Sequence, residues 1–257
     1  RVAGGGHPDQ VHPDRRAGAT WLEPICGRLD PAHIVVCPGA QAALAAAILA
    51  YTAPGATILA EPMSYPGLRD AATHLGRRLV TVEADEHGMV PERLEEACRR
   101  DRPALIYLNP TLQNPTAVTM PESRRQALAG IAQRYDLRIL EDDPYWLLAD
   151  APPPPMMTLA PNHVLYVSTL SKCLAPGLRV AFVVLPDPDE RARFLGDLGD
   201  ELHCAGRRSD HADPLARQVD AVVPFGGVPF RPGEIMNAGD FRKAGAAELP
   251  ERRDDRV

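Results

Sequence analysis

Short apolar segments alternate with helix-like segments along most of this chain, and this alternation restricts its fold more than any other feature. Strands are predicted in seven apolar or β-branched runs: Ile34–Cys37, Thr57–Ala60, Leu79–Val82, Ala104–Leu108, Arg138–Glu141, His163–Val167 and Val180–Leu185. Helices are predicted between them at Ala40–Tyr51, Gly67–Leu75, Pro91–Arg100 and Pro121–Tyr135. Such alternation favours an α/β fold, in which a mostly parallel seven-stranded sheet lies between two helical layers.

The composition argues against two classes of function. The net charge of −6 leaves no basic excess for nucleic acid, so no nucleic-acid partner is expected. No apolar stretch reaches the roughly 20 residues of a membrane-spanning helix, and the longest, Gln41–Tyr51, is alanine-rich and suits a buried helix. The five cysteines lack C-x-x-C spacing, which supports neither a metal site nor a disulfide framework. We expect a cytoplasmic protein without a metal.

Three parts are expected along the chain. Residues 1–33 are interpreted as the lead-in segment of a truncated domain, because the sequence starts without methionine or a signal peptide. Residues 34–195 form the large α/β domain, within which the prolines at 152–155 predict an extended surface connection. Residues 196–257 lack sustained periodicity and are interpreted as an aberrant, disordered tail, which a reading-frame change in a GC-rich gene would explain.

A lysine among small hydroxyl residues is the first chemical feature. Lys172 follows Ser171, and Arg179 comes seven positions later. A lysine amine can form a Schiff base with an aldehyde, while hydroxyls and a guanidinium can hold a phosphate. The run therefore suits an aldehyde cofactor that carries a phosphate. From these residues alone, a solvated lysine in a Ser/Thr-rich turn is the alternative.

Two further segments have chemistry of their own. Gly39 lies in a turn between a predicted strand and helix, where free N–H groups can bind an anion; an ordinary strand–helix turn is the alternative. Glu141, Asp142 and Asp143 end a predicted strand. Adjacent acids could also form a metal site or a solvated strand end, but no histidine lies nearby in the sequence.

Five segments taken together resemble the class I/II aminotransferases of fold type I, which depend on pyridoxal phosphate. They are Cys37–Gln41, Glu61–Gly67, Asn109–Thr116, Glu141–Tyr145 and Ser168–Arg179, and they occur in the order of that family. The wording S-K-C-L-A-P-G-L-R is closest to the aminotransferase-like domain of GntR/MocR-type regulators. The resemblance covers residues 4–193 and implies a seven-stranded large domain that binds pyridoxal phosphate.

The resemblance also implies roles for individual residues. Six would hold the cofactor phosphate: Gly39, Ala40, Gln41, Thr169, Ser171 and Arg179. Five would contact the ring or take part in catalysis: Tyr65 by stacking, Asn114 at the phenolic oxygen, Asp142 at the pyridine nitrogen, Tyr145 near the phenolic oxygen, and Lys172 as the Schiff-base lysine that moves the substrate proton. Asn109 begins a second N-P-T triplet, which we interpret as a decoy, and Ala117 stands where the family usually has glycine.

The function implied is transamination between an amino acid and a 2-oxo acid, in a homodimer. One alternative is an amino-acid-sensing domain of a MocR-type regulator, although this chain has no winged-helix segment. Another is an inactive truncated fragment. The family also uses an arginine in its small C-terminal domain and a tyrosine from the neighbouring subunit. Residues 196–257 have no recognisable copy of that arginine motif, so the small domain is expected to be missing or aberrant, and no tyrosine precedes Tyr51.

Overall fold

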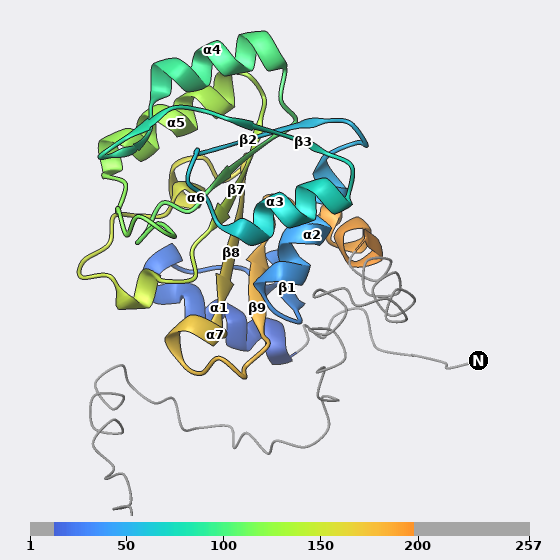
Figure 1. The fold of residues 1–257 in the computed structure, drawn as a ribbon. Coiled ribbons are helices and arrows are strands. Elements are labelled where there is room, and N and C mark those ends of the chain that lie inside the picture. Colours follow the sequence, from blue (N-terminus) through green and yellow to red (C-terminus); the bar gives the residue numbers. More distant parts are fainter. Residues whose placement is uncertain (1–12, 198–257) are drawn as a thin grey trace, which may run out of the picture. The chain divides into compact units, whose positions relative to one another are not determined.

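The computed structural model describes residues 13–197, which form an α/β structure around one large sheet (Figure 1). The seven strands lie in the order β1-β9-β8-β7-β6-β2-β3. Their bounds are β1 Ile34–Cys37, β2 Thr57–Ala60, β3 Arg78–Thr81, β6 Leu105–Leu108, β7 Arg138–Asp142, β8 Val164–Thr169 and β9 Ala181–Val184. Strand β9 is antiparallel to both of its neighbours, and all the other pairs are parallel. The predicted fold class is confirmed.

Helices cover both faces of this sheet, and each face has its own apolar core. They are α1 Pro13–Cys26, α2 Ala40–Tyr51, α3 Pro66–His74, α4 Pro91–Asp101, α5 Glu122–Arg134, α6 Met156–Leu159 and α7 Leu170–Cys173. Helices α1, α4, α5 and α6 contribute to one core and α2 and α3 to the other. A two-stranded hairpin joins β4 Ala84–Asp85 to β5 Gly88–Met89. None of the described helices has the length and apolar character needed to cross a membrane.

The predicted bounds of these strands and helices hold to within two residues. Helix α2 has the predicted bounds, and α4 begins at Pro91, where the missing proline N–H costs nothing.

Helix α1 was not predicted, since it lies in the segment interpreted as a lead-in. It buries Gly18, Leu22 and Cys26, whose spacing of four residues places them on one helix face. The predicted tail at 196–257 lies outside the described residues except for its first two positions, which continue a helical stretch at 191–197.

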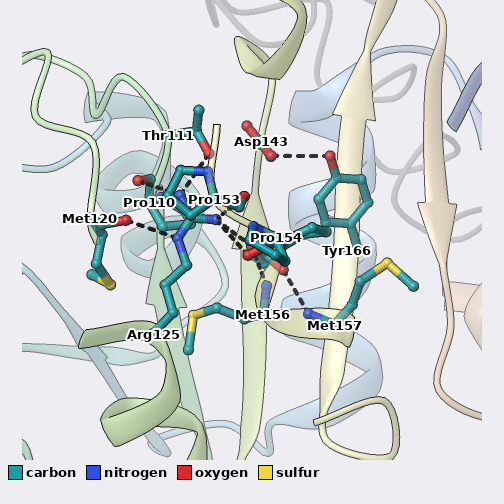
Figure 2. Close-up of polar contacts among 12 residues, drawn as sticks. Pro110, Thr111, Met120, Arg125, Asp143, Pro153, Pro154, Met156, Met157 and Tyr166 are labelled. Atoms are coloured by element: carbon teal, nitrogen blue, oxygen red, sulfur yellow. Dashed lines mark hydrogen bonds and ion pairs between the residues drawn. The ribbon is translucent and has the colours of Figure 1, made fainter. Parts of the chain in front are cut away.

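The expectation of a surface connection at residues 152–155 was only partly right. Pro155 is buried, and the carbonyls of Pro153 and Pro154 accept hydrogen bonds from the guanidinium of Arg125 at 3.5 and 3.2 Å. Arg125 has no exposed surface, and its other donors reach Pro110 O, Thr111 Oγ1 and Met120 O at 3.0–3.1 Å (Figure 2). A buried guanidinium is tolerated when its donors are satisfied in this way. Arg125 therefore ties the proline segment and both ends of the loop at 110–120 to α5.

Strand register brings the chemical segments together at one edge of the sheet. Cys37 and Thr169 both pair with Ala181, so β1 and β8 end beside the start of β9. Val167 pairs with Asp142, which places the end of β7 at the same edge. Ligands of parallel α/β sheets bind outside the carboxyl ends of the strands. This edge is therefore where a site is expected.

Candidate functional site

An anion-binding arrangement forms where β1 meets α2. Gly39 is the N-cap of α2 and has φ +97°, a conformation that favours glycine. A Cβ at this position would lie 3.0 Å from Nη2 of Arg179, so the guanidinium packs against the glycine backbone. The first N–H groups of a helix have no partner within the helix, and here the helix begins beside the Arg179 guanidinium. The structure thus brings Gly39, Ala40 and Arg179 together.

The hydroxyls on either side of Leu170 form a second polar group at this edge. Thr169 is the N-cap of α7, and its Oγ1 accepts from the Ser171 N–H at 3.3 Å and lies 3.0 Å from Ser171 Oγ. The same hydroxyl donates to the carbonyl of Val180 at 3.0 Å, one residue after Arg179. Lys172 follows in α7 with an exposed side chain. Two hydroxyls, a guanidinium and a lysine therefore lie where β8 ends and β9 begins.

Gln41 supports an aromatic residue as well as standing at the start of α2. Its Nε2 donates to the Gly67 carbonyl at 3.1 Å, and its Oε1 accepts from the Tyr65 hydroxyl at 3.1 Å. Burial raises the pKa of the Tyr65 hydroxyl, the charge of Asp142 raises it further, and Arg179 lowers it. Tyr65 therefore lies within electrostatic reach of both Asp142 and Arg179. Its side chain is partly buried, with a fixed hydroxyl.

Within the described residues, Asp142 is a buried acid with one unpartnered oxygen, as is Asp143 on the other face of the sheet. Its side chain is 8% exposed, and Oδ2 accepts a hydrogen bond from the Tyr107 hydroxyl at 2.8 Å. Its Oδ1 is buried and has no hydrogen-bond partner among residues 13–197. Burial raises the pKa of this carboxyl to about 6, against the opposing effects of the Tyr107 hydrogen bond and the charge of Lys172. A buried, unpartnered carboxylate oxygen is costly unless a ligand donor satisfies it.

The two acids on either side of Asp142 face the opposite side of the sheet, because side chains alternate along a strand. Glu141 accepts hydrogen bonds from the backbone N–H groups of Met156 and Met157 at 2.9 and 3.1 Å. Asp143 Oδ2 accepts from the Tyr166 hydroxyl at 3.1 Å (Figure 2). All three acids are buried, so the alternative of a solvated strand end is wrong. Across residues 13–197, no group of three His, Cys, Asp or Glu side chains could hold a metal ion.

The loop after β6 reaches Asp142 through an asparagine that sequence reasoning passed over. Asn109 donates from Nδ2 to the backbone carbonyl of Asp142 at 2.6 Å. Its Oδ1 accepts from the backbone N–H of Asn114 at 2.7 Å. The residue interpreted as a decoy therefore links two predicted site residues. One signal was available: Tyr107 lies in β6 and Asn109 follows its last residue, so a spacing of two places both side chains on the face that meets Asp142.

Tyr145 lies three residues after Asp142 and within electrostatic reach of it. Burial raises the pKa of its hydroxyl, and the nearby charge of Asp142 adds to this effect. A cavity of about 260 Å³ has walls from the β2–α3 connection, the hairpin β4–β5 and the loop at 109–120. Asn109 lines this cavity, and so do Pro110 and Met120, which accept hydrogen bonds from Arg125. None of the residues that the sequence predicted for the site lines the cavity.

Comparisons with known proteins agree with this geometry. The family described as "Aminotransferase class I and II" matches residues 17–219, most of the chain. The chain belongs to this family. Its members depend on pyridoxal phosphate, and the match begins within α1, which the sequence reading had left outside the large domain.

Two kinds of relative are found among curated proteins. The 2-aminoadipate transaminase of Thermus thermophilus is 36% identical over 197 residues, which cover 74% of this chain and 48% of the enzyme. The uncharacterised HTH-type transcriptional regulator YdeF of Bacillus subtilis is 38% identical over 154 residues, which cover 60% of this chain and 33% of the regulator. This chain therefore spans between a third and a half of the length of these relatives.

A solved structure gives the same result for the fold. The α-aminoadipate aminotransferase LysN of Thermus thermophilus, crystallised with N-(5'-phosphopyridoxyl)-L-leucine, has a TM-score of 0.66 and 30% identity. The match covers 80% of this chain and 51% of LysN. The aspartate aminotransferase of Thermus thermophilus, at 22% identity and a TM-score of 0.66, shares the fold.

Removing the Tyr107 hydroxyl should change the pH dependence of cofactor binding. Without this donor the pKa of Asp142 rises above about 6, so more of the carboxyl is protonated at pH 6.5 and little more at pH 8.5. We expect Tyr107→Phe to weaken binding of pyridoxal phosphate about threefold to tenfold at pH 6.5 and much less at pH 8.5. Equilibrium dialysis at both pH values measures this, with Tyr166→Phe as the control on the other face of the sheet. Equal weakening at both pH values would contradict the prediction.

Proposed function

We propose that this chain binds pyridoxal phosphate through Lys172 and transfers an amino group from an amino acid to a 2-oxo acid. The observation that carries the proposal is the pair of binding features at one sheet edge. A buried carboxylate oxygen of Asp142 without a partner supports a cationic N–H donor, and the Gly39–Arg179 contact supports a bound anion. Protonated pyridine nitrogen and phosphate are the two ends of that cofactor. We further propose residues 34–195 as the core of the cofactor-binding domain.

The phosphate would be held at the start of α2 and α7. Backbone N–H groups of Ala40 and Gln41 would donate to its oxygens, with the Arg179 guanidinium as counter-charge. The Ser171 hydroxyl would supply a further donor, and Thr169, whose own hydroxyl hydrogen goes to the Val180 carbonyl, would hold Ser171 in place. The phosphate contacts would fix the position of the cofactor, and the reaction would take place at its ring.

The ring would lie between Tyr65 and the end of β7. An ionised Asp142 keeps the pyridine nitrogen protonated, Asn114 and Tyr145 would donate to the phenolic oxygen, and Tyr65 would stack on the ring face. When bound, the cofactor supplies an aldehyde that accepts an amino group and a cationic ring that stabilises a carbanion. Residues at both ends of the cofactor would fix its orientation, and Lys172 in α7 would be the residue that reacts with the aldehyde.

Lys172 has two tasks in this proposal. Its amine would hold the cofactor through the aldehyde group. When free, the same amine would serve as the base and acid that removes and returns the proton of the substrate α carbon. The exposed position of Lys172 in α7 suits both tasks, because the amine must reach substrate from solvent.

The relatives suggest which substrates to test first. They include transaminases of 2-aminoadipate and kynurenine, so we propose a donor with a long or aromatic side chain and a 2-oxo acid as acceptor. We also propose that two copies associate, as is typical of the family.

A single-turnover experiment tests the proposed function. The full chain is loaded with pyridoxal phosphate and mixed with one equivalent of 2-aminoadipate or kynurenine, and the 2-oxo acid is measured by mass spectrometry. Formation of the 2-oxo acid in proportion to loaded protein is expected, and addition of 2-oxoglutarate should restore the original visible spectrum. Absence of any 2-oxo acid with a panel of amino acids, from protein that carries the cofactor, would contradict transamination.

The similarity to YdeF and to a second regulator, YdfD, favours one other function, amino-acid sensing without turnover. The cofactor residues would be the same. The two functions differ in the experiment above: a sensor changes its spectrum on binding the amino acid and releases no 2-oxo acid.

A further inference from the structure

Asn109 is the residue of this region that the proposed function leaves without a role. Its side chain is 4% exposed, and both ends of its amide are used. The NH₂ group donates to the Asp142 carbonyl at 2.6 Å, and the oxygen accepts from the Asn114 N–H at 2.7 Å. Few side chains can donate and accept simultaneously on such a short stem. The position therefore requires an amide of this length.

The two partners of Asn109 belong to segments that are otherwise fixed separately. Asp142 ends β7 and is held by its register with Val167 and by the Tyr107 hydroxyl. Asn114 lies in the loop at 110–120, which is closed by the bond from Met120 N to Pro110 O at 2.8 Å and anchored to α5 by Arg125. Asn109 joins this loop to the end of β7 by two hydrogen bonds.

We propose that Asn109 is a positioning residue, which fixes the separation of Asp142 and Asn114 so that both can contact one cofactor ring. This inference rests on the proposed function, since it concerns the pyridine nitrogen and the phenolic oxygen of the same ring. Asn109 touches neither atom itself; it acts through the backbone of the residues that do. A shift of either residue would weaken one contact of the ring while leaving the other.

Two substitutions separate its two hydrogen bonds. Asn109→Asp is nearly isosteric and keeps an oxygen that accepts from Asn114 N–H, but it places an acceptor against the Asp142 carbonyl. Asn109→Ala removes both bonds. Tyr166→Phe is the matched control, because it removes one buried hydrogen bond, 3.1 Å long, to the adjacent Asp143 on the other face of the sheet. Thermal unfolding of the cofactor-free proteins shows how much each change costs the fold.

The decisive readout is the pH titration of the visible absorption of the bound cofactor. A donor at the phenolic oxygen and a carboxylate at the pyridine nitrogen both favour the deprotonated form of the chromophore, so loosening them should raise the midpoint. We expect a rise of about one pH unit for Asn109→Ala, about half of that for Asn109→Asp, and none for Tyr166→Phe. The dissociation constant of pyridoxal phosphate should rise about tenfold in Asn109→Ala.

The outcomes distinguish this inference from the proposed function. Suppose that the unmodified chain binds the cofactor at Lys172 and that the titration midpoints of both Asn109 variants equal that of Tyr166→Phe. Asn109 is then merely structural, and the positioning role is wrong while the proposed function stands. If the unmodified chain forms no adduct at Lys172, the proposed function and this inference fall together. Should Asn109→Ala not fold, the midpoint of the nearly isosteric Asn109→Asp decides the question.

Discussion

Replacing Lys172 by alanine is expected to abolish the visible absorption band that pyridoxal phosphate acquires on binding to this chain. The band requires a covalent bond between a lysine amine and the cofactor aldehyde, and the sequence contains just two lysines, Lys172 and Lys243. Of these, Lys172 lies in α7 beside the hydroxyls of Thr169 and Ser171, and its charge lowers the pKa of Asp142. The loss should be complete rather than partial.

The small number of lysines provides a matched control. Lys243 lies outside the described residues, and Lys243→Ala should keep the visible band at full strength. Both variants are titrated with pyridoxal phosphate and recorded from 300 to 500 nm, with circular dichroism to verify that each is folded. A band that persists in Lys172→Ala, or one that disappears in Lys243→Ala, would assign the covalent bond to another amine.

Asp142→Asn is expected to reduce the rate of amino-group transfer by about 10²–10³-fold, the range found when one electrostatic group of an active site is removed. The carboxyl has a pKa raised to about 6 by burial, so it is ionised at pH 7.5 and can keep a pyridine nitrogen protonated. A neutral amide cannot do so. Single-turnover kinetics at pH 7.5 measure the change, and equilibrium dialysis separates it from loss of binding.

Asp143→Asn is the matched comparison, because it changes the same functional group one residue away. Asp143 faces the other side of the sheet, where burial raises its pKa to about 7 and the Tyr166 hydroxyl donates to it. Asparagine resembles the protonated form of this carboxyl, so the rate of amino-group transfer in Asp143→Asn should fall less than about tenfold. Equal losses in the two variants would mean that the aspartate opposite the pyridine nitrogen has been assigned wrongly.

The fold could be predicted from the sequence because it depends on local patterns. Apolar runs such as Ile34–Cys37 and Leu105–Leu108 fill strands buried on both faces, and Ala40–Tyr51 forms the buried helix between β1 and β2. Helix α1 escaped prediction because Pro24 and its polar residues obscure the spacing of Gly18 and Leu22. Packing against the sheet, rather than local preference, is what stabilises such a helix.

The residues of the site could be predicted only where a motif carried them. Gly39, Asp142 and Lys172 lie in segments with recognisable sequence motifs, and the sheet brings these segments to one edge. Tyr107 and Asn109 were missed, because their partners lie 35 and 33 residues away and become neighbours only through the pairing of β6 with β7. The buried Arg125 was also missed, because it donates to backbone carbonyls, which every residue has and which no residue type therefore indicates.

Borohydride reduction followed by peptide mapping shows whether Lys172 forms the covalent bond to pyridoxal phosphate. Reduction makes the bond permanent, and with two lysines and the N-terminal amine as the available amines, the assignment is unambiguous. We expect a single pyridoxyl adduct on the peptide that contains Lys172, in proportion to the cofactor bound. An adduct on Lys243 or the N-terminus, or no adduct at saturating cofactor, would contradict it.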